Sequence, residues 1–555
     1  MLRNINKSYT YTFFMIVLVN LCSHFDLNAC TNFIITKGAS KDGSTMITYS
    51  ADAGGFMEPL KFFPAMEHKP GTMLDIYDWD SGKYLGKIPQ AKNTYKVVGN
   101  INEFQLSIAE TTFGGIDSLR DTTGLVDYGS LMYIVLQRAK NAQEAITLID
   151  TLLNKYGYYS SGESFSIADP NEAWIMEVIG KGAGSKGAVW AAYRIPDGYI
   201  AAHANQSRIR NLIKNDINNC RYSKDLIDFA KKKNIYKEYK NEFSFADTFN
   251  PLDPGSVLYC EGRVWRFYTL AAPSQNLSDE YFRAFENAEP YPLFIKPDNK
   301  IGVKELQTWM RDHFEDTPYD MTKGLGAGPY GCPYRWKGLE WKIDGDSVNT
   351  YGWERPISTQ QTAFSFIMQL RSFMPNHIGG LMWYGVDDAA STCYIPLYCS
   401  MTEVPKAFEG GSIAEYNPNS GFWIFNLVAN RAYSNYKNVI IDIKKVQSRF
   451  EDSFLAYQNV VENSALELNK QNSDLAVDFL NDYSINNTMK VMDTWTDLWK
   501  HLTVKYNDGY INDVKKNNGR SPKGSGYNNE FLKKVLEERP GYYDVRWKKK
   551  NKEIN

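Results

Sequence analysis

The 555-residue sequence is poor in histidine and cysteine and lacks the short motifs of several common enzyme classes. It has six histidines and no HExxH motif, so a zinc metalloprotease has little support. Its seven cysteines include no CxxC pair, which argues against zinc ribbons and thioredoxin-type redox sites. A GxSxG motif is also absent, which weakens the case for a serine α/β-hydrolase.

The sequence also lacks a strong charge of either sign. Its formal net charge of −2 gives no reason to expect nucleic acid or an anionic membrane surface as a partner. Lysine runs at 231–233 and 548–550 are interpreted as a solvated helix face and a polar tail. The length allows a large core and more than one packing unit, and a homo-oligomer is left open.

The N-terminal segment, residues 1–29, has the pattern of a signal peptide. Arg3 and Lys7 form a basic start, and an apolar run follows from Phe13 to Leu21. This run is too short to span a bilayer as a mature helix. We therefore predict a secreted or periplasmic protein with no stable membrane insertion once the signal is removed.

The predicted cleavage point leaves more than one outcome open. Ala29 is a suitable small residue before the cut, but Leu27 is larger than signal peptidases usually prefer two positions earlier. Residues 27–30 also loosely fit a bacterial lipobox, in which Cys30 would be lipidated and the protein anchored. The polar residues Ser23, His24 and Asp26 separate the apolar run from Cys30, which favours a free cysteine. Cleavage further upstream, followed by self-removal of a propeptide, would give the same free cysteine.

Cleavage before Cys30 would place a thiol and a free α-amine on one residue. An N-terminal nucleophile needs this pair, because the sulfur attacks a carbonyl and the amine takes its proton. A free α-amine has a pKa of roughly 7.7–8.0, so it can act as a base near neutral pH. Cys30 is therefore the leading candidate for catalysis.

The pattern along the chain indicates an α+β protein. Residues 31–36 and 44–50 read as a hairpin, 131–135 and 142–153 as two helices, and Asn141 with Glu144 as a capping box between them. Strand pairs are predicted at 165–168 with 173–178, and at 189–194 with 199–203. Hairpins, helices and further hairpins suggest sheets covered by helices. We predict a core at 30–420, a helical extension packed on it at 421–515, and a polar, basic tail at 516–555.

These stretches resemble the C69 dipeptidases, which are cysteine members of the N-terminal nucleophile hydrolase superfamily. The matching segments are 29–31, 42–45, 110–115, 127–131, 203–206, 263–266, 318–324, 355–360 and 387–393. The resemblance implies a four-layer αββα sandwich with the nucleophile at the start of a central strand. It also implies hydrolysis of dipeptides through an acyl-enzyme, with no metal or cofactor.

The resemblance implies roles for particular residues, and the chain departs from the family pattern at one position. The family commonly has Arg-Asn-Glu-Asp after the second strand, where this chain has residues 49–52: Asp52 is kept, but Tyr49 replaces the Arg. Asp52 would orient the α-amine of Cys30. Asn205 follows a predicted strand and would donate to the oxyanion, although it also suits the cap of a helix starting near Ser207.

The remaining candidates concern charge and substrate binding. Arg266 or Arg208 would brace the aspartate or bind a substrate carboxylate, and the sequence does not choose between them. Glu110 and Asp320 are candidates for binding the free amine of a dipeptide. His203 is interpreted as structural or as lining the pocket, because an N-terminal nucleophile needs no histidine base.

The sequence thus predicts a secreted cysteine dipeptidase that acts through Cys30. Two alternatives stay open at this point. One is an amidase or acylase of the same fold that acts on N-acyl amino acids. The other is a lipid-anchored surface protein on a catalytically disabled hydrolase fold. The lipobox-like residues 27–30 and the presence of Tyr49 in place of the usual Arg support this alternative.

Overall fold

The computed structural model describes residues 30–213, 216–336, 339–345, 349–513, 515–520 and 522–545. The predicted signal peptide at 1–29 and the basic run at 548–550 lie outside the described residues. Within those ranges, none of the helices combines the length and the apolar character that crossing a bilayer requires.

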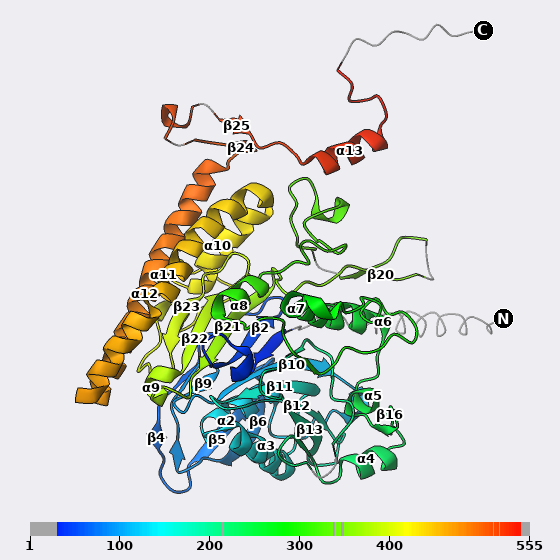
Figure 1. The fold of residues 1–555 in the computed structure, drawn as a ribbon, viewed down its shortest axis with the longest axis vertical. Helices are drawn as coiled ribbons and strands as arrows, with labels where there is room; N and C mark the ends of the chain where they lie inside the picture. Colours follow the sequence, from blue (N-terminus) through cyan, green and yellow to red (C-terminus); the bar gives the residue numbers. More distant parts are fainter. Residues whose placement is uncertain are drawn as a thin grey trace, which may run out of the picture.

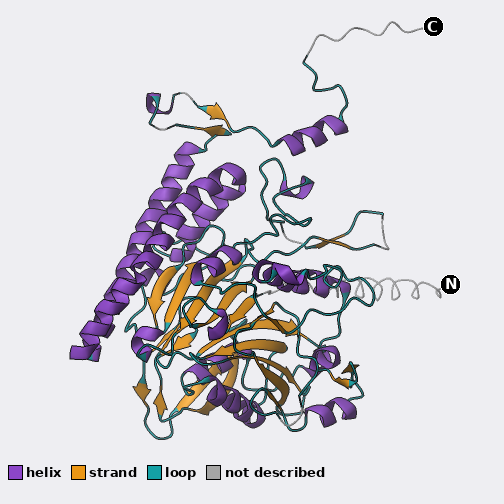
Figure 2. Ribbon diagram, viewed as in Figure 1, coloured by secondary structure: helices purple, strands orange, loops and turns teal. Residues whose placement is uncertain are grey.

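Two large antiparallel sheets form the centre of the described structure (Figures 1 and 2). In order across the first sheet, the seven strands are β18 (Phe294–Ile295), β14 (Ile200–His203), β1 (Asn32–Ile35), β2 (Thr45–Asp52), β21 (Thr362–Leu370), β22 (Leu381–Val386) and β23 (Ile395–Tyr398). In order across the second, the eight strands are β15 (Cys220–Tyr222), β13 (Ala188–Arg194), β12 (Ala173–Gly180), β11 (Gly162–Ala168), β10 (Ser107–Gly114), β9 (Ile101–Asn102), β8 (Val97–Val98) and β3 (Phe62–Phe63).

The two sheets face each other and carry helices on their outer sides. Strands β1 and β2 pack against β10, and β2 also packs against β11. Helices α2 (Tyr128–Leu136) and α3 (Ala142–Tyr156) cover the second sheet. Helices α7 (Gly262–Ala271), α8 (Val303–Trp309), α10 (Gly421–Tyr433) and α12 (Ser473–Lys505) pack on strands of the first. Because both faces are covered, every residue of β1 and β2 is buried.

The predicted α+β class is confirmed, as are several local elements. Strands β1 and β2 pair as a hairpin with Ile34 opposite Ile47, and β11 pairs with β12. The side chain of Asn141 accepts a hydrogen bond from the backbone N–H of Glu144 at the start of α3, as the capping pattern predicts. These elements depend on contacts between residues close in sequence.

The predicted pairing of 189–194 with 199–203 is wrong. Strand β13 pairs with β12 and β15 in the second sheet, whereas β14 pairs with β1 and β18 in the first. The turn at 195–198 therefore carries the chain from one sheet to the other. Thr36 secures the crossing, since its side-chain hydroxyl donates to the carbonyl of Tyr199 at 2.7 Å. The crossing places Asn32 opposite His203, directly beside the start of β1.

The C-terminal part is helical, as predicted from about residue 422. Helix α10 is followed by α11 (Tyr436–Gln471) and α12, which run side by side (Figure 1). Beyond them, β24 (Tyr510–Ile511) pairs with β25 (Lys523–Gly524), so part of the predicted polar tail at 516–555 belongs to a hairpin. The predicted boundaries of the core at 420 and of the helical extension at 515 stay predictions.

The shorter elements complete the described fold. They are β4 (Met66–Glu67), β5 (Met73–Tyr77), β6 (Tyr84–Pro89), β7 (Asn93–Thr94), α4 (Leu226–Lys232), β16 (Glu238–Tyr239), β17 (Glu242–Phe243), α5 (Phe245–Phe249), α6 (Pro254–Ser256), β19 (Glu340–Trp341), β20 (Tyr351–Gly352), α9 (Asn376–Gly379) and α13 (Asn529–Glu538).

Candidate active site

Cys30 lies immediately before the central strand β1, at the wall of a cavity. Its backbone carbonyl accepts a hydrogen bond from Nη1 of Arg263 at 2.6 Å. The next residue, Thr31, exchanges backbone hydrogen bonds with Ser50 of β2 at 3.0 and 3.3 Å. The position of the thiol is therefore fixed by the sheet on one side and by a guanidinium on the other. Its residue is only 8% exposed.

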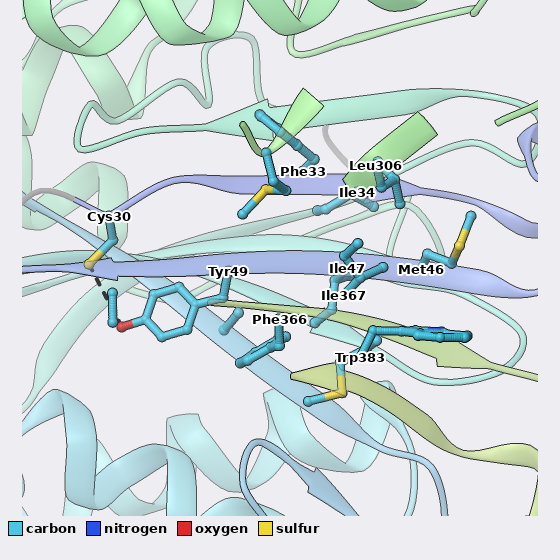
Figure 3. Close-up of a cluster of buried hydrophobic side chains, with 14 of the residues drawn as sticks. Cys30, Phe33, Ile34, Met46, Ile47, Tyr49, Leu306, Phe366, Ile367 and Trp383 are labelled. Carbon is cyan, nitrogen blue, oxygen red and sulfur yellow. Dashed lines mark hydrogen bonds between the residues drawn. The ribbon is translucent and has the colours of Figure 1, made fainter. Parts of the chain in front are cut away.

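The Cys30 thiol has two polar side chains within reach. The Oη atom of Tyr49 lies 3.7 Å from Sγ (Figure 3). The Oε1 atom of Glu110 also lies 3.7 Å from Sγ, and the Tyr49 hydroxyl donates a hydrogen bond to it. Burial raises the pKa of the thiol well above its ordinary value, and the charges of Glu110 and Asp52 raise it further. In the free site the sulfur is therefore held as a neutral thiol.

Glu110 and Glu163 form a buried carboxyl pair beside the thiol. Glu110 lies on β10 two residues before Thr112, and Thr112 is in register with Glu163 on β11. The Thr112 hydroxyl donates to Oε1 of Glu163 at 2.6 Å, and the carboxyl groups of Glu110 and Glu163 are hydrogen-bonded to each other. Burial raises the pKa of Glu110 to about 7, and burial with the charge of Glu110 raises that of Glu163. The two carboxyl groups therefore share a proton at neutral pH.

Asp52 lies at the end of β2 and lines the same cavity. It is 1% exposed and forms an ion pair with Nη2 of Arg355 at 2.8 Å. The hydroxyl groups of Thr362 and Ser50 donate to its two oxygens at 2.7 and 3.2 Å. Arg355 lies within a matching segment of the sequence but was not among the predicted site residues, because its partner is 303 positions away.

We expect Arg355→Met to lower the free energy of unfolding by about 3–5 kcal/mol, because it leaves the Asp52 carboxylate buried without its cation. Chemical denaturation monitored by circular dichroism measures this change. The matched control is Lys470→Met, which removes the cation of an exposed ion pair with Glu467 and should change stability by less than about 0.5 kcal/mol. Equal stability of the Arg355 variant and the unaltered protein would contradict the role given to this ion pair.

Asn205 follows β14 and has a left-handed backbone conformation, with φ of 62°. No helix begins at Ser207, where the sequence suggested one, so the predicted alternative of a helix cap is wrong. The Asn205 side chain instead donates from Nδ2 to the carbonyl of Thr112 at 2.7 Å and accepts at Oδ1 from Arg263 at 3.1 Å. Asn205 therefore joins strand β10 to the residue that holds Cys30.

Arg263 is the main residue that the sequence analysis missed. It is fully buried in the first turn of α7 and donates to the Cys30 carbonyl, the Thr31 hydroxyl and the side-chain oxygen of Asn205. Burial and the neighbouring charge of Arg355 lower its pKa to about 9, so it stays charged at neutral pH. Residues 263 and 266 are three apart and share a helix face, and the sequence alone did not show that Arg263 is the one that binds the backbone of Cys30.

The structure does not bring the other predicted site residues to this cavity. Arg266 is bound through two atoms to Asp312, at 2.8 and 2.6 Å. Arg208 is paired with buried Glu261 at 3.2 Å, and Asp320 is paired with Lys323 at 2.8 Å. None of the three predicted residues lines the cavity beside Cys30.

His203 lies between the two sheets rather than at the thiol. One ring nitrogen contacts the Thr111 hydroxyl at 2.8 Å and the other contacts the Ser166 hydroxyl at 2.7 Å. Burial lowers its pKa to about 3, so the ring is neutral. This environment fits the structural interpretation of His203.

The cavity beside Cys30 has a volume of about 520 Å³, counted with its open mouth. It is lined by Cys30, Tyr49, Ala51, Asp52, Ala53, Phe56, Trp79, Asp80, Asn100, Glu110, Thr112, Tyr128, Met132, Tyr133 and Phe364. Three of these side chains are carboxylic acids, and none is lysine, arginine or histidine. The lining therefore favours a ligand with a positive charge and apolar surface.

The described residues offer no cluster of three or more histidine, cysteine, aspartate or glutamate side chains arranged to hold a metal ion. The cysteines within the described ranges are all free thiols. A buried thiol at the cavity wall, with a carboxyl pair beside it and a hydrogen-bonded amide near it, is suited to nucleophilic attack on a carbonyl carbon.

Comparison with known proteins places the chain among the peptidases. The model of peptidase family C69 matches residues 29–449, which defines the protein as a hydrolase of peptide bonds. The chain belongs to peptidase family C69. The match includes Cys30 and all the residues that line the cavity.

Several curated relatives are similar over most of their length. The chain is 24% identical to a probable dipeptidase of Latilactobacillus sakei, over 83% of this chain and 94% of the relative. It is 24% identical to dipeptidase A of Lactobacillus helveticus, over 84% of this chain and 93% of the relative. A probable dipeptidase of Salmonella dublin is 25% identical, over 69% of this chain and 84% of the relative.

Proposed function

We propose that the protein is a secreted dipeptidase whose nucleophile is the thiol of an N-terminal Cys30. The observation that supports this most directly is the position of Cys30 at the wall of an acidic, aromatic-lined cavity, immediately before the central strand β1. We also infer that the facing sheets and their helices form the αββα sandwich of the N-terminal nucleophile hydrolases. Secretion rests on the signal-peptide pattern at residues 1–29.

In this proposal the α-amine of Cys30 takes the proton of its own thiol, and the sulfur attacks the substrate carbonyl carbon. The S–C bond forms, and the amide C–N bond breaks as the amine returns the proton to the leaving nitrogen. Water then hydrolyses the thioester, which releases a carboxylic acid and restores the thiol. Asn205 is the proposed oxyanion donor, because Arg263 binds both its side-chain oxygen and the Cys30 carbonyl. Asp52, held by Arg355, would orient the amine.

The acidic lining explains why a dipeptide suits the cavity better than an N-acyl amino acid. A dipeptide has a free ammonium group at neutral pH, whereas an N-acyl amino acid has none. Glu110 is the proposed partner of this ammonium, because it lines the cavity beside the thiol and no basic side chain lines the cavity with it. The relatives described as dipeptidases support the same substrate class.

We expect acetylation of the amino group to lower kcat/KM for a given dipeptide by about 100-fold or more, because a buried carboxylate would lose its charged partner. Rates for free, N-acetylated and C-terminally amidated forms of one dipeptide, together with an N-acyl amino acid, measure this preference. The amidated form serves as the matched control, because it removes the charge at the other end of the dipeptide and keeps the free ammonium. Faster hydrolysis of the N-acyl compound would instead support the acylase alternative.

A further inference from the structure

Tyr49 occupies the position where the resemblance leads one to expect an arginine. Its hydroxyl lies between the Cys30 sulfur, at 3.7 Å, and the carboxylate of Glu110, to which it donates. A hydroxyl group carries a single proton, so Tyr49 cannot donate to Glu110 and to the sulfur at the same time. In the described arrangement the proton is committed to Glu110, and the thiol itself is the donor to Tyr49.

Among the described residues, no lysine, arginine or histidine side chain lines the cavity beside the sulfur, and the α-amine of Cys30 must itself be neutral to take the thiol proton. Arg263 binds the Cys30 carbonyl, and Arg355 binds Asp52. The titratable side chains that act on Glu110 from the elements around it are Cys30 before β1, Tyr49 of β2, Glu163 of β11, Asp80 before β6, Tyr128 and Tyr133 of α2, and Tyr158, while Asp52 acts on the thiol. None of these side chains is basic.

We propose that the substrate's own α-ammonium supplies the positive charge that Tyr49 does not, and so activates the Cys30 thiol. This inference rests on the proposed function. The ammonium binds Glu110 and neutralises its charge, which releases the Tyr49 hydroxyl to donate to the sulfur. The thiol then ionises more readily, and its proton passes to the α-amine of Cys30.

The geometry supports each part of this coupling. Glu110 lines the cavity and is 2% exposed, and no lysine, arginine or histidine is among the other lining residues, so a bound ammonium would be the cation nearest to its carboxylate there. The Oε1 atom of the same carboxylate receives the Tyr49 proton. Tyr49 is fixed by edge-on contacts with Phe364 and Phe366, at ring-centre distances of 5.6 and 5.5 Å. The hydroxyl proton can therefore change partner without a movement of the ring.

Selectivity for a free amine then depends on activation of the thiol as well as on binding. A substrate without a free amine loses both the contact to Glu110 and the activation of the thiol. N-acetylation should therefore lower kcat as well as raise KM. Tyr49→Arg supplies a permanent cation, so in that variant N-acetylation should act mainly on KM.

The test is the rate at which iodoacetamide alkylates Cys30, with and without L-alaninol, an α-amine that has no carbonyl to be attacked. At pH 8 we expect alaninol to accelerate alkylation of the unaltered protein by about tenfold or more. The reason is that a change of charge at Glu110, so close to the thiol, moves the pKa of the thiol by about one unit or more. N-acetylalaninol, which is neutral, should have no effect. At pH 5.5 alaninol should have no effect either, since the pKa of Glu110 is about 7 and its charge is already absent.

Variants separate the groups involved. Glu110→Gln should be alkylated faster than the unaltered protein without alaninol and should not respond to it. Asp320→Asn is the matched control, because Asp320 was the other predicted ammonium partner and lies away from the cavity; it should keep the full response. The comparison of alkylation rates at pH 8 and pH 5.5 uses only the unaltered protein, so it stays informative even if a variant fails to fold.

Two results would overturn the inference: an alkylation rate at pH 8 that alaninol leaves unchanged, or an equal response in Glu110→Gln. Neither result concerns turnover, so a protein that hydrolyses free dipeptides but fails this test would keep the proposed function. A protein that hydrolyses none, yet responds to alaninol, would lose the proposed function and keep the ammonium site.

Discussion

Cys30→Ala is expected to abolish dipeptide hydrolysis, with a loss in kcat on the order of 10⁴-fold or more, because no other group at the cavity can form the acyl-enzyme. The substitution removes one sulfur atom from the cavity wall and leaves the carbonyl that Arg263 binds, so the fold should be retained. Hydrolysis of a dipeptide and the far-ultraviolet circular dichroism spectrum measure the two effects.

The matched control for Cys30→Ala is Cys332→Ala. Cys332 is a free, partly buried thiol that does not line the cavity. This variant should keep the kcat of the unaltered protein. Hydrolysis that survives in Cys30→Ala, or disappears in Cys332→Ala, would place the nucleophile elsewhere.

Arg263→Met is expected to lower kcat by about 10²–10³-fold, because the Cys30 carbonyl and the Asn205 side chain lose their common donor. Its removal also leaves several buried carbonyl and side-chain oxygens without a partner, so the free energy of unfolding should fall by about 2–5 kcal/mol. Separate measurement of kcat, KM and urea denaturation distinguishes misplacement of the site from unfolding.

Arg266→Met, one helical turn further along α7, is the control for Arg263→Met. Arg266 is bound to Asp312 outside the cavity, so this variant should lose stability but keep the kcat of its folded fraction. If instead Arg266→Met lost kcat and Arg263→Met kept it, the sequence-based assignment of Arg266 to catalysis would hold.

The sequence predicted those parts of the fold that depend on neighbouring residues. The β1–β2 hairpin, the β11–β12 hairpin and the capped helix α3 follow from short-range pattern and turn chemistry. The pairing of β13 with β14 was wrong because a turn signal shows only that the chain reverses direction. Which sheet receives the next strand depends on β1, more than 160 residues earlier in the chain.

The residues of the candidate site also fall into those that the sequence indicated and those that only the fold brings together. Cys30 was recognised because processing would expose it, and Glu110, Asp52 and Asn205 because they lie in segments that match the family. The structure places the first three at one cavity and links Asn205 to it through Arg263. The partners Arg263 and Arg355 were missed, because a buried arginine is recognised by the distant groups it binds rather than by its neighbours in sequence.

Whether Cys30 is a free N-terminal nucleophile is tested by the intact mass and N-terminal sequence of the protein exported by its native host. We expect a chain that starts at an unmodified Cys30, with both a free α-amine and a free thiol. A diacylated or triacylated Cys30 would contradict it, because neither the nucleophile nor its base would then be free.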